Sequence, residues 1–274
     1  MKPSPMNVSI GVFDSGVGGL SVLRALRSLL PNAKYIYFAD QAHVPYGSRP
    51  VDQVRTFAES ITRFLLEQGA EVIIVACNTA SASALHELRN RFQNVPFVGM
   101  EPAVKPAAEH TKTGVVGVLA TPTTFQGALY ASIVERFANG VTVLQHTCPG
   151  LVSQIEKGEL STPKTRSILQ DALIPMLDRG IDTVVLGCTH YPFVIPLIED
   201  ICGDQVRVID PAPAVARQTQ RVLESGARLS AFTKNPAIGF FTSGEVANFQ
   251  SILKQLIGET HPANQVVWKG LELS

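Results

Sequence analysis

Short runs of Val and Ile, alternating with stretches of helical periodicity, are the feature that most constrains how this chain can fold. The runs are bounded by Gly, Pro, Asp or Asn and lie at 8–13, 35–38, 72–76, 115–119, 183–186 and 206–209. In the stretch 54–68 between two of them, apolar side chains recur on one helical stripe. Unbroken apolar strands alternating with amphipathic helices are typical of parallel sheets covered on both faces. The sequence therefore predicts an α/β fold.

The chain also contains a weak internal repeat. Residues 71–79 and 182–190 each begin with an acidic residue and run through a short apolar segment to a cysteine followed by polar residues. Residues 10–15 resemble 116–121, and the two pairs of segments are similarly spaced along the chain. Because all buried parallel strands resemble one another, the matched spacing and the cysteines are the informative part of this repeat.

The repeat and the length of 274 residues together indicate two related domains. We expect two similar three-layer α/β domains with mostly parallel sheets, related by a pseudo-two-fold axis, with the active site in the cleft between them. The proline-interrupted crossing at 210–213 is expected to return the chain to the first domain. The expected limits are 1–100 plus 211–274 for the first domain and 101–210 for the second.

Composition and charge exclude several classes of protein. Lys plus Arg and Asp plus Glu each number 23, and the resulting zero net charge disfavours a generic nucleic-acid binder. No apolar run approaches the length of about 20 residues that spans a membrane, and the N-terminus lacks the apolar core of a signal peptide. We therefore expect a cytoplasmic protein with reduced cysteines.

The absence of a CxxC motif disfavours a structural zinc site, and Cys148 and Cys202 are expected to be structural.

The residues that follow the expected strands are the candidates for function, because ligands of such folds bind beyond the carboxyl ends of the strands. The turn 14–21 is rich in glycine and opens a helix, whose N-terminal N–H groups suit an anion. It is neither the dinucleotide fingerprint nor a P-loop. The segment 45–48, Pro-Tyr-Gly-Ser, is a turn with exposed donors. From the residues alone, either turn could be purely structural.

Two cysteines occupy equivalent strand ends. Cys77 and Cys188 are each expected where a strand meets a helix, and a helix N-terminus lowers the pKa of a thiol. His190 follows Cys188 closely and can tune the thiol or move a proton. If the two domains face each other, one thiolate can remove a proton from a tetrahedral carbon while the opposite thiol donates one to the other face. The alternatives are buried small hydrophobic side chains and half of a Cys-x-His metal site.

Four ordered motifs resemble the glutamate racemase family, which comprises cofactor-independent racemases that use two cysteines. They are GVFDSGVGGLSVL at 11–23, PYG at 45–47, CNTA at 77–80 and GCTHYP at 187–192. The likeness extends from about residue 10 to residue 244, nearly the whole chain. It implies two α/β domains, often assembled as homodimers, that interconvert L- and D-glutamate without pyridoxal phosphate or metal. The D-glutamate would supply peptidoglycan synthesis.

The resemblance also implies roles for individual residues. Cys77 corresponds to the base that removes the α-proton of D-glutamate, and Cys188 to the base for L-glutamate. Asp14 would assist the first thiol and His190 the second. Substrate contacts are expected for Ser15, Pro45, Tyr46, Gly47, Ser48, Asn78, Thr79, Thr121, Thr124 and Thr189.

Two acidic residues, Asp40 and Glu156, match further family acids near the site. From the residues alone, Glu156 is a solvated helix residue. Its surroundings depart from the family pattern, with Gly150-Leu151 in place of a bulkier apolar pair and Ser153 in place of proline. His43 stands where an arginine is common.

Other functions remain open at this stage. A racemase for aspartate or another amino acid, or a maleate isomerase, would belong to the same two-cysteine superfamily. A non-catalytic amino-acid-binding protein would share a cleft, but it would normally be exported and would not need paired cysteines. A thiol redox protein is disfavoured by the distance between the cysteines along the chain. Pyridoxal phosphate would need a Schiff-base lysine, and the strand-end motifs offer none.

Overall fold

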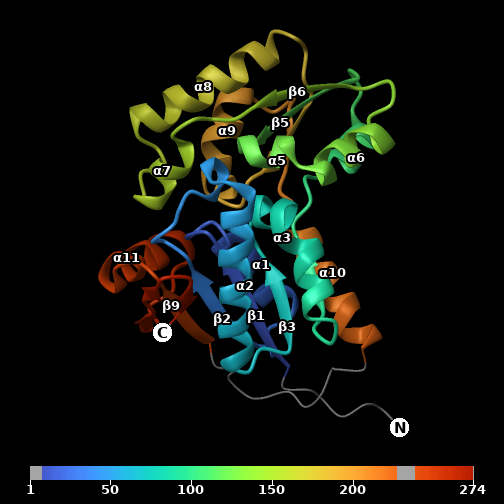
Figure 1. The fold of residues 1–274 in the computed structure, drawn as a ribbon. Helices are drawn as coiled ribbons and strands as arrows, with labels where there is room; N and C mark the ends of the chain where they lie inside the picture. Colours follow the sequence, from blue (N-terminus) through green and yellow to red (C-terminus); the bar gives the residue numbers. More distant parts are fainter. Residues whose placement is uncertain (1–7, 227–237, 274) are drawn as a thin grey trace.

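The computed structural model describes residues 8–226 and 238–273, which form two parallel β-sheets with helices on both faces (Figure 1). The first sheet has the strand order β10-β9-β2-β1-β3-β4, and the second has the order β6-β5-β7-β8. The strands of the first are β1 (Ser9–Asp14), β2 (Lys34–Ala39), β3 (Val72–Val75), β4 (Phe97–Gly99), β9 (Ile238–Thr242) and β10 (Ala263–Gln265). Those of the second are β5 (Val115–Ala120), β6 (Thr142–His146), β7 (Thr183–Gly187) and β8 (Arg207–Ile209).

Helices cover the sheets, and a small hairpin ends the described chain. The helices are α1 (Leu20–Leu29), α2 (Val51–Glu67), α3 (Asn78–Arg91), α4 (Val104–His110), α5 (Pro122–Gln126), α6 (Ala128–Phe137), α7 (Leu151–Glu156), α8 (Pro163–Leu177), α9 (Ile195–Cys202), α10 (Ala212–Ser225) and α11 (Val246–Ile257). Two 3-10 turns, η1 (Tyr46–Ser48) and η2 (Tyr191–Val194), lie in loops. The hairpin consists of β11 (Trp268–Lys269) and β12 (Glu272–Leu273), which pair antiparallel.

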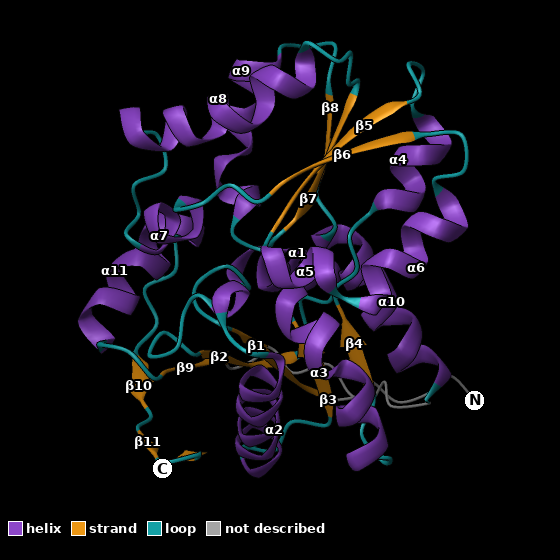
Figure 2. Cartoon of the chain, turned by 45° about the horizontal axis from the view of Figure 1, so that its top comes forward, coloured by secondary structure: helices purple, strands orange, loops and turns teal. Residues whose placement is uncertain are grey.

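Each sheet is the middle of three layers. Helices α2 and α3 bury their apolar stripes against one face of the first sheet, and α1, α10 and α11 cover the other face. In the second sheet, α4 and α6 cover one face, whereas α8 and α9 cover the other (Figure 2). Strands β1 and β3 are buried along their whole length, as expected of central parallel strands. The predicted α/β layers with parallel sheets are confirmed.

The internal repeat corresponds to a repeated topology. The order β2-β1-β3-β4 in the first sheet recurs as β6-β5-β7-β8 in the second. Strand β3 therefore has its counterpart in β7, and a cysteine follows within two residues of the end of each of these strands. Strands β9 and β10, from the last part of the chain, extend the first sheet only. This strand membership supports the expected domain limits near residues 100 and 210, which stay a prediction.

All six strands expected from the sequence are present, each within one residue of its expected ends. Strands β4, β6, β9 and β10 and the short hairpin were not anticipated. Strand β6 alternates between exposed and half-buried positions around Leu144, so it lacks the continuous apolar run of a central strand. No helix within 8–226 or 238–273 has both the length and the apolarity to cross a membrane.

Asp182 anchors the start of the second sheet. Its carboxylate accepts hydrogen bonds from the Thr111 hydroxyl at 2.8 Å, the Thr113 backbone N–H at 3.0 Å and the Thr183 hydroxyl at 3.0 Å. Burial alone would raise the pKa of this carboxyl, but these bonds and one from the Lys112 N–H lower it to about 2. The charged form therefore holds the loop before β5 against the start of β7.

We predict that Asp182→Asn lowers the free energy of unfolding by about 1–2 kcal/mol at pH 7, because charge-assisted hydrogen bonds are lost. The folded-state pKa lies below the ordinary 3.8, so this contribution is complete above that pH and disappears as the pH falls through about 2. Thermal unfolding of both proteins at pH 7 and at pH 3 tests this. Asp178→Asn, at an exposed position, is the matched control. If both variants lose the same free energy of unfolding, the role of Asp182 is contradicted.

Candidate active site

A small cavity lies where the carboxyl ends of the two sheets approach each other. Its walls come from the residues that follow β1, β2, β3, β5 and β7, together with one side chain of α7. The lining residues are Ser15, Pro45, Tyr46, Gly47, Cys77, Asn78, Thr79, Thr121, Val152, Cys188, Thr189 and His190. Ten of the expected site residues therefore share one cavity with His190, among them both cysteines. The free space is only about 10 Å³, the volume of about one water molecule.

Cys77 lies two residues beyond the end of β3 and is the N-cap of α3. The N–H of Ala80 donates to Cys77 Sγ at 3.4 Å, and Sγ lies 3.9 Å from Ser15 Oγ. The sequence predicted a lowered pKa for this thiol, and that prediction is wrong for this closed site. Burial and the nearby carboxyl of Asp14 raise the pKa of Cys77, and they outweigh the bond from the helix N-terminus.

Cys188 occupies the equivalent position after β7, and a histidine stands beside it. His190 Nδ1 lies 3.7 Å from Cys188 Sγ, and His190 Nε2 lies 2.6 Å from Glu156 Oε1. Burial opposes protonation of the imidazole, but its bonds to Cys188 and Glu156 outweigh burial and raise the pKa of His190 well above its usual value. The arrangement therefore places an imidazolium between a thiol and a carboxylate.

Glu156 joins the second domain to the glycine-rich turn of the first. Its Oε1 accepts a hydrogen bond from the N–H of Val17 at 2.8 Å. A Cβ on Gly16 would lie 1.9 Å from Glu156 Oε1, and one on Gly18 would lie 2.4 Å from His190 Nδ1. The turn therefore needs glycine for this close approach, and the anion that it binds in the described chain is the carboxylate of Glu156. The interpretation of Glu156 as a solvated helix residue is wrong.

Asp14 lies behind the cavity wall, at the end of β1. It is fully buried and accepts hydrogen bonds from the Gly16 N–H at 3.0 Å and the Thr189 hydroxyl at 3.1 Å. Burial is the main cause that raises the pKa of Asp14, and the neighbouring His190 partly offsets it. Asp14 is thus an acid with a raised pKa that lies close to Cys77. It also accepts a hydrogen bond from Thr189, the residue after Cys188.

Hydroxyl and amide groups complete the cavity wall. The hydroxyls of Thr79 and Thr121 lie 2.8 Å apart, and that of Thr124 lies 3.0 Å behind Thr121. Asn78 is 3% exposed, and neither atom of its amide has a hydrogen-bond partner. Because buried polar groups are normally paired, this amide is suited to a polar ligand in the cavity.

Five expected residues do not line the cavity: Asp14 and Glu156, described above, and Asp40, Thr124 and Ser48. Asp40 lies behind the wall, where it accepts a hydrogen bond from the Tyr46 hydroxyl at 2.6 Å. Thr124 touches the wall only through Thr121. Ser48 is exposed, and its hydroxyl lies 3.4 Å from the carbonyl of Pro45. The prediction that Ser48 belongs to the site therefore receives no support from its position.

Sequence reasoning missed other residues at the site. Val152 of α7 contributes an apolar part of the cavity wall. Thr123 donates to the carbonyl of Gly47 at 2.8 Å, and Gln41 donates to Glu156 at 3.1 Å. Nothing in the local sequence marks these positions, because their partners lie far away along the chain.

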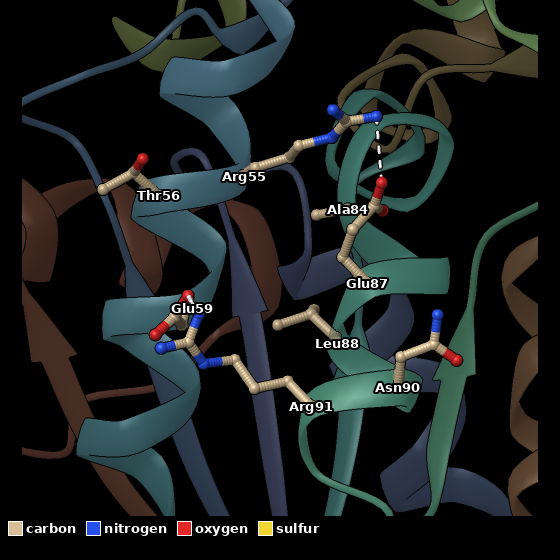
Figure 3. Close-up of a pocket in the computed structure, with 8 residues that line it drawn as sticks. All are labelled: Arg55, Thr56, Glu59, Ala84, Glu87, Leu88, Asn90 and Arg91. Atoms are coloured by element: carbon tan, nitrogen blue, oxygen red, sulfur yellow. Dashed lines mark ion pairs between the residues drawn. The ribbon is translucent and has the colours of Figure 1, made fainter.

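A larger hollow lies between α2 and α3, away from the cysteines (Figure 3). Arg55 pairs with Glu87 at 3.0 Å, and Arg91 pairs with Glu59 at 2.9 Å. The charges of this hollow neutralise one another, and it offers no nucleophile. Within the described residues 8–226 and 238–273, no cluster of three or more His, Cys, Asp or Glu side chains could hold a metal ion.

Comparison with known proteins gives consistent results. Residues 11–219 match the family described as Asp/Glu/hydantoin racemase. A glutamate racemase of Roseiflexus is 50% identical over 248 residues, which are 90% of this chain and 91% of that protein. The glutamate racemase of Escherichia coli in complex with L-glutamate superposes with a TM-score of 0.85 at 31% identity, covering 96% of this chain and 100% of that one. The glutamate racemase of Francisella tularensis in complex with D-glutamate superposes with a TM-score of 0.82 at 31% identity. The match covers 96% of this chain and 98% of that one.

The family match covers most of the chain, and the relatives match it almost from end to end. The two thiols that the sequence singled out lie in one cavity between the two sheets. On these grounds, the chain belongs to the Asp/Glu/hydantoin racemase family.

Proposed function

We propose that this protein is a glutamate racemase that interconverts L- and D-glutamate by a two-base proton transfer at the α-carbon. The observation that carries the proposal is that Cys77 and Cys188, from equivalent strand ends of the two sheets, line the same cavity. Inversion of a tetrahedral carbon needs one group that removes a proton from one face and another that donates a proton to the opposite face. A pair of thiols that line one cavity from two different sheets can meet this requirement.

The surroundings of the two thiols suggest how each is activated. In the L-to-D direction Cys188, which lies beside the imidazole of His190, removes the α-proton of L-glutamate. The Cys77 thiol donates its proton to the other face of the carbanion and becomes a thiolate. Asp14, with its raised pKa, can take up or return the proton that restores the Cys77 side. The reverse reaction uses the same groups with their roles exchanged.

Uncharged donors hold the substrate in this proposal. The hydroxyls of Ser15, Thr79, Thr121 and Thr189 and the free amide of Asn78 face or border the cavity. They can bind the carboxylates of glutamate through local dipoles, which agrees with the zero net charge of the chain. Because about 10 Å³ is far too small for an amino acid, binding requires the walls to separate and then close again.

Glutamate is favoured over other amino acids by the relatives. The solved neighbours with TM-scores of 0.85 and 0.82 are glutamate racemases in complex with L-glutamate and D-glutamate. An aspartate racemase is the alternative. We further propose that the protein acts in the cytoplasm as a homodimer and that its D-glutamate feeds peptidoglycan synthesis.

We predict that the purified protein racemises glutamate in the presence of a chelator and without an added cofactor. In deuterated water the product will carry deuterium at the α-carbon, because the proton that is returned comes from a solvent-exchanged thiol. Circular dichroism follows turnover, and mass spectrometry follows the label, with L-aspartate as the comparison substrate. Faster turnover of aspartate would reverse the assignment of substrate.

We predict that Cys77→Ala and Cys188→Ala each reduce racemisation by about 10³-fold or more, as expected for removal of an essential acid or base. Cys148→Ala is the matched control, because Cys148 is also buried and unpaired but does not line the cavity. It should retain turnover close to that of the wild type. Near-native activity in either of the first two variants would disprove the role of that thiol.

We predict that Glu156→Gln lowers the pKa of His190, because the variant removes the negative charge that favours the imidazolium. The imidazole then loses its proton at lower pH, so the basic limb of the pH profile of kcat/KM moves to lower pH. The equilibrium constant of a racemisation is one, so kcat/KM shifts equally for both enantiomers. An unchanged pH profile would show that Glu156 does not act through His190.

A further inference from the structure

The carboxylate of Asp40 connects two distant parts of the chain. Its Oδ1 accepts hydrogen bonds from Trp268 Nε1 at 2.8 Å and from the Ser243 hydroxyl at 2.7 Å. Its Oδ2 accepts one from the Tyr46 hydroxyl at 2.6 Å and lies 2.9 Å from His43 Nδ1. Asp40 is fully buried, and a buried carboxylate is stable only when donors of this kind surround it. Two donors thus come from the C-terminal part of the chain and two from the loop before α2.

Trp268 is held in place by aromatic packing on α2. Its ring centroid lies 5.3 Å from that of Phe57 and 4.9 Å from that of His43. His43 in turn stacks on Phe57 at 3.9 Å. The hairpin formed by β11 and β12 also bonds to α2, because the Ser60 hydroxyl donates to the carbonyl of Leu271. Two-residue strands are not stable by themselves, so the packing of the indole on Phe57 and His43, rather than the hairpin, fixes where its N–H points.

The loop on the other side of Asp40 forms part of the active-site wall. Tyr46 is 1% exposed and lines the cavity beside Cys77, and its hydroxyl bonds to Asp40. The next residue, Gly47, packs against Thr121 of the second domain so closely that a Cβ would lie 2.6 Å from Thr121 Cβ. A shift of Tyr46 would therefore move the wall and its contact with the opposite domain.

We propose that Trp268 is a positioning residue for substrate binding, which acts through the carboxylate of Asp40 on Tyr46 and Gly47. The proposal rests on the proposed glutamate racemase function. The indole N–H fixes one oxygen of Asp40, and the other oxygen fixes the Tyr46 hydroxyl. Trp268 thereby contributes to substrate binding, although it does not itself line the cavity.

The test compares Trp268→Phe, which keeps an aromatic ring but removes the N–H, with the wild-type protein. We expect KM for both enantiomers of glutamate to rise about three- to tenfold, as for loss of a hydrogen bond to a charged group, with a smaller change in kcat. Ser60→Ala is the matched control, because it loosens the same hairpin without touching Asp40, and its KM should be unchanged. A rise in KM for Ser60→Ala equal to that for Trp268→Phe would overturn the proposal.

A double-mutant cycle with Tyr46→Phe separates positioning from general loosening. If Trp268 acts through Asp40 on Tyr46, the double variant should raise KM by much less than the product of the two single effects. Fully multiplicative effects would overturn the proposal. If Trp268→Phe does not fold, as judged by circular dichroism, Ser243→Ala removes the other C-terminal donor and should raise KM in the same direction. An unchanged KM in that variant would then overturn the proposal.

Wild-type turnover is measured first, so that the two proposals fail separately. If the wild-type protein does not racemise glutamate, both the proposed function and the positioning role are wrong. If it does, and Trp268→Phe has the wild-type KM, only the positioning role is wrong.

Discussion

The close approach of the second domain to the glycine-rich turn of the first is the contact on which the site depends. At Gly16 and Gly18 there is no room for a side chain, because Glu156 and His190 occupy the space where a Cβ would stand. The same contact supplies the Val17 N–H to the carboxylate of Glu156. Without it, the carboxylate of Glu156 would lose the Val17 N–H, and the two thiols would not share one cavity.

Burial then decides the acid–base character of the groups brought together. In a nearly closed cavity the charged forms of Cys77 and Asp14 are disfavoured, and the pKa values of both rise. His190 is equally buried, yet its pKa rises rather than falls, because two partners stabilise its cationic form. The two sides of the proposed site are therefore chemically unequal. One side has a neutral thiol next to a carboxyl, and the other has a thiol next to an imidazolium.

Much of this arrangement was predictable from the sequence. The apolar runs located the central strands, and the repeat of a cysteine after equivalent strands identified Cys77 and Cys188 as a pair. Strands β4, β6, β9 and β10 were missed, and β6, for example, is half-exposed and lacks a continuous apolar run. The lowered pKa expected for Cys77 was wrong, because the helix N-terminus contributes less than burial and Asp14. Burial of a thiol cannot be read from the residues next to it in the chain.

The sequence by itself determined the α/β class, the repeated topology and the strand ends at which the chemistry lies, because these follow from local periodicity and from short motifs. Only the tertiary structure decided which groups meet. Three contacts join residues that are distant in the chain: Glu156 with His190, Trp268 with Asp40, and Thr123 with Gly47. They depend on how two sheets and a C-terminal hairpin pack together, and no local pattern records that packing.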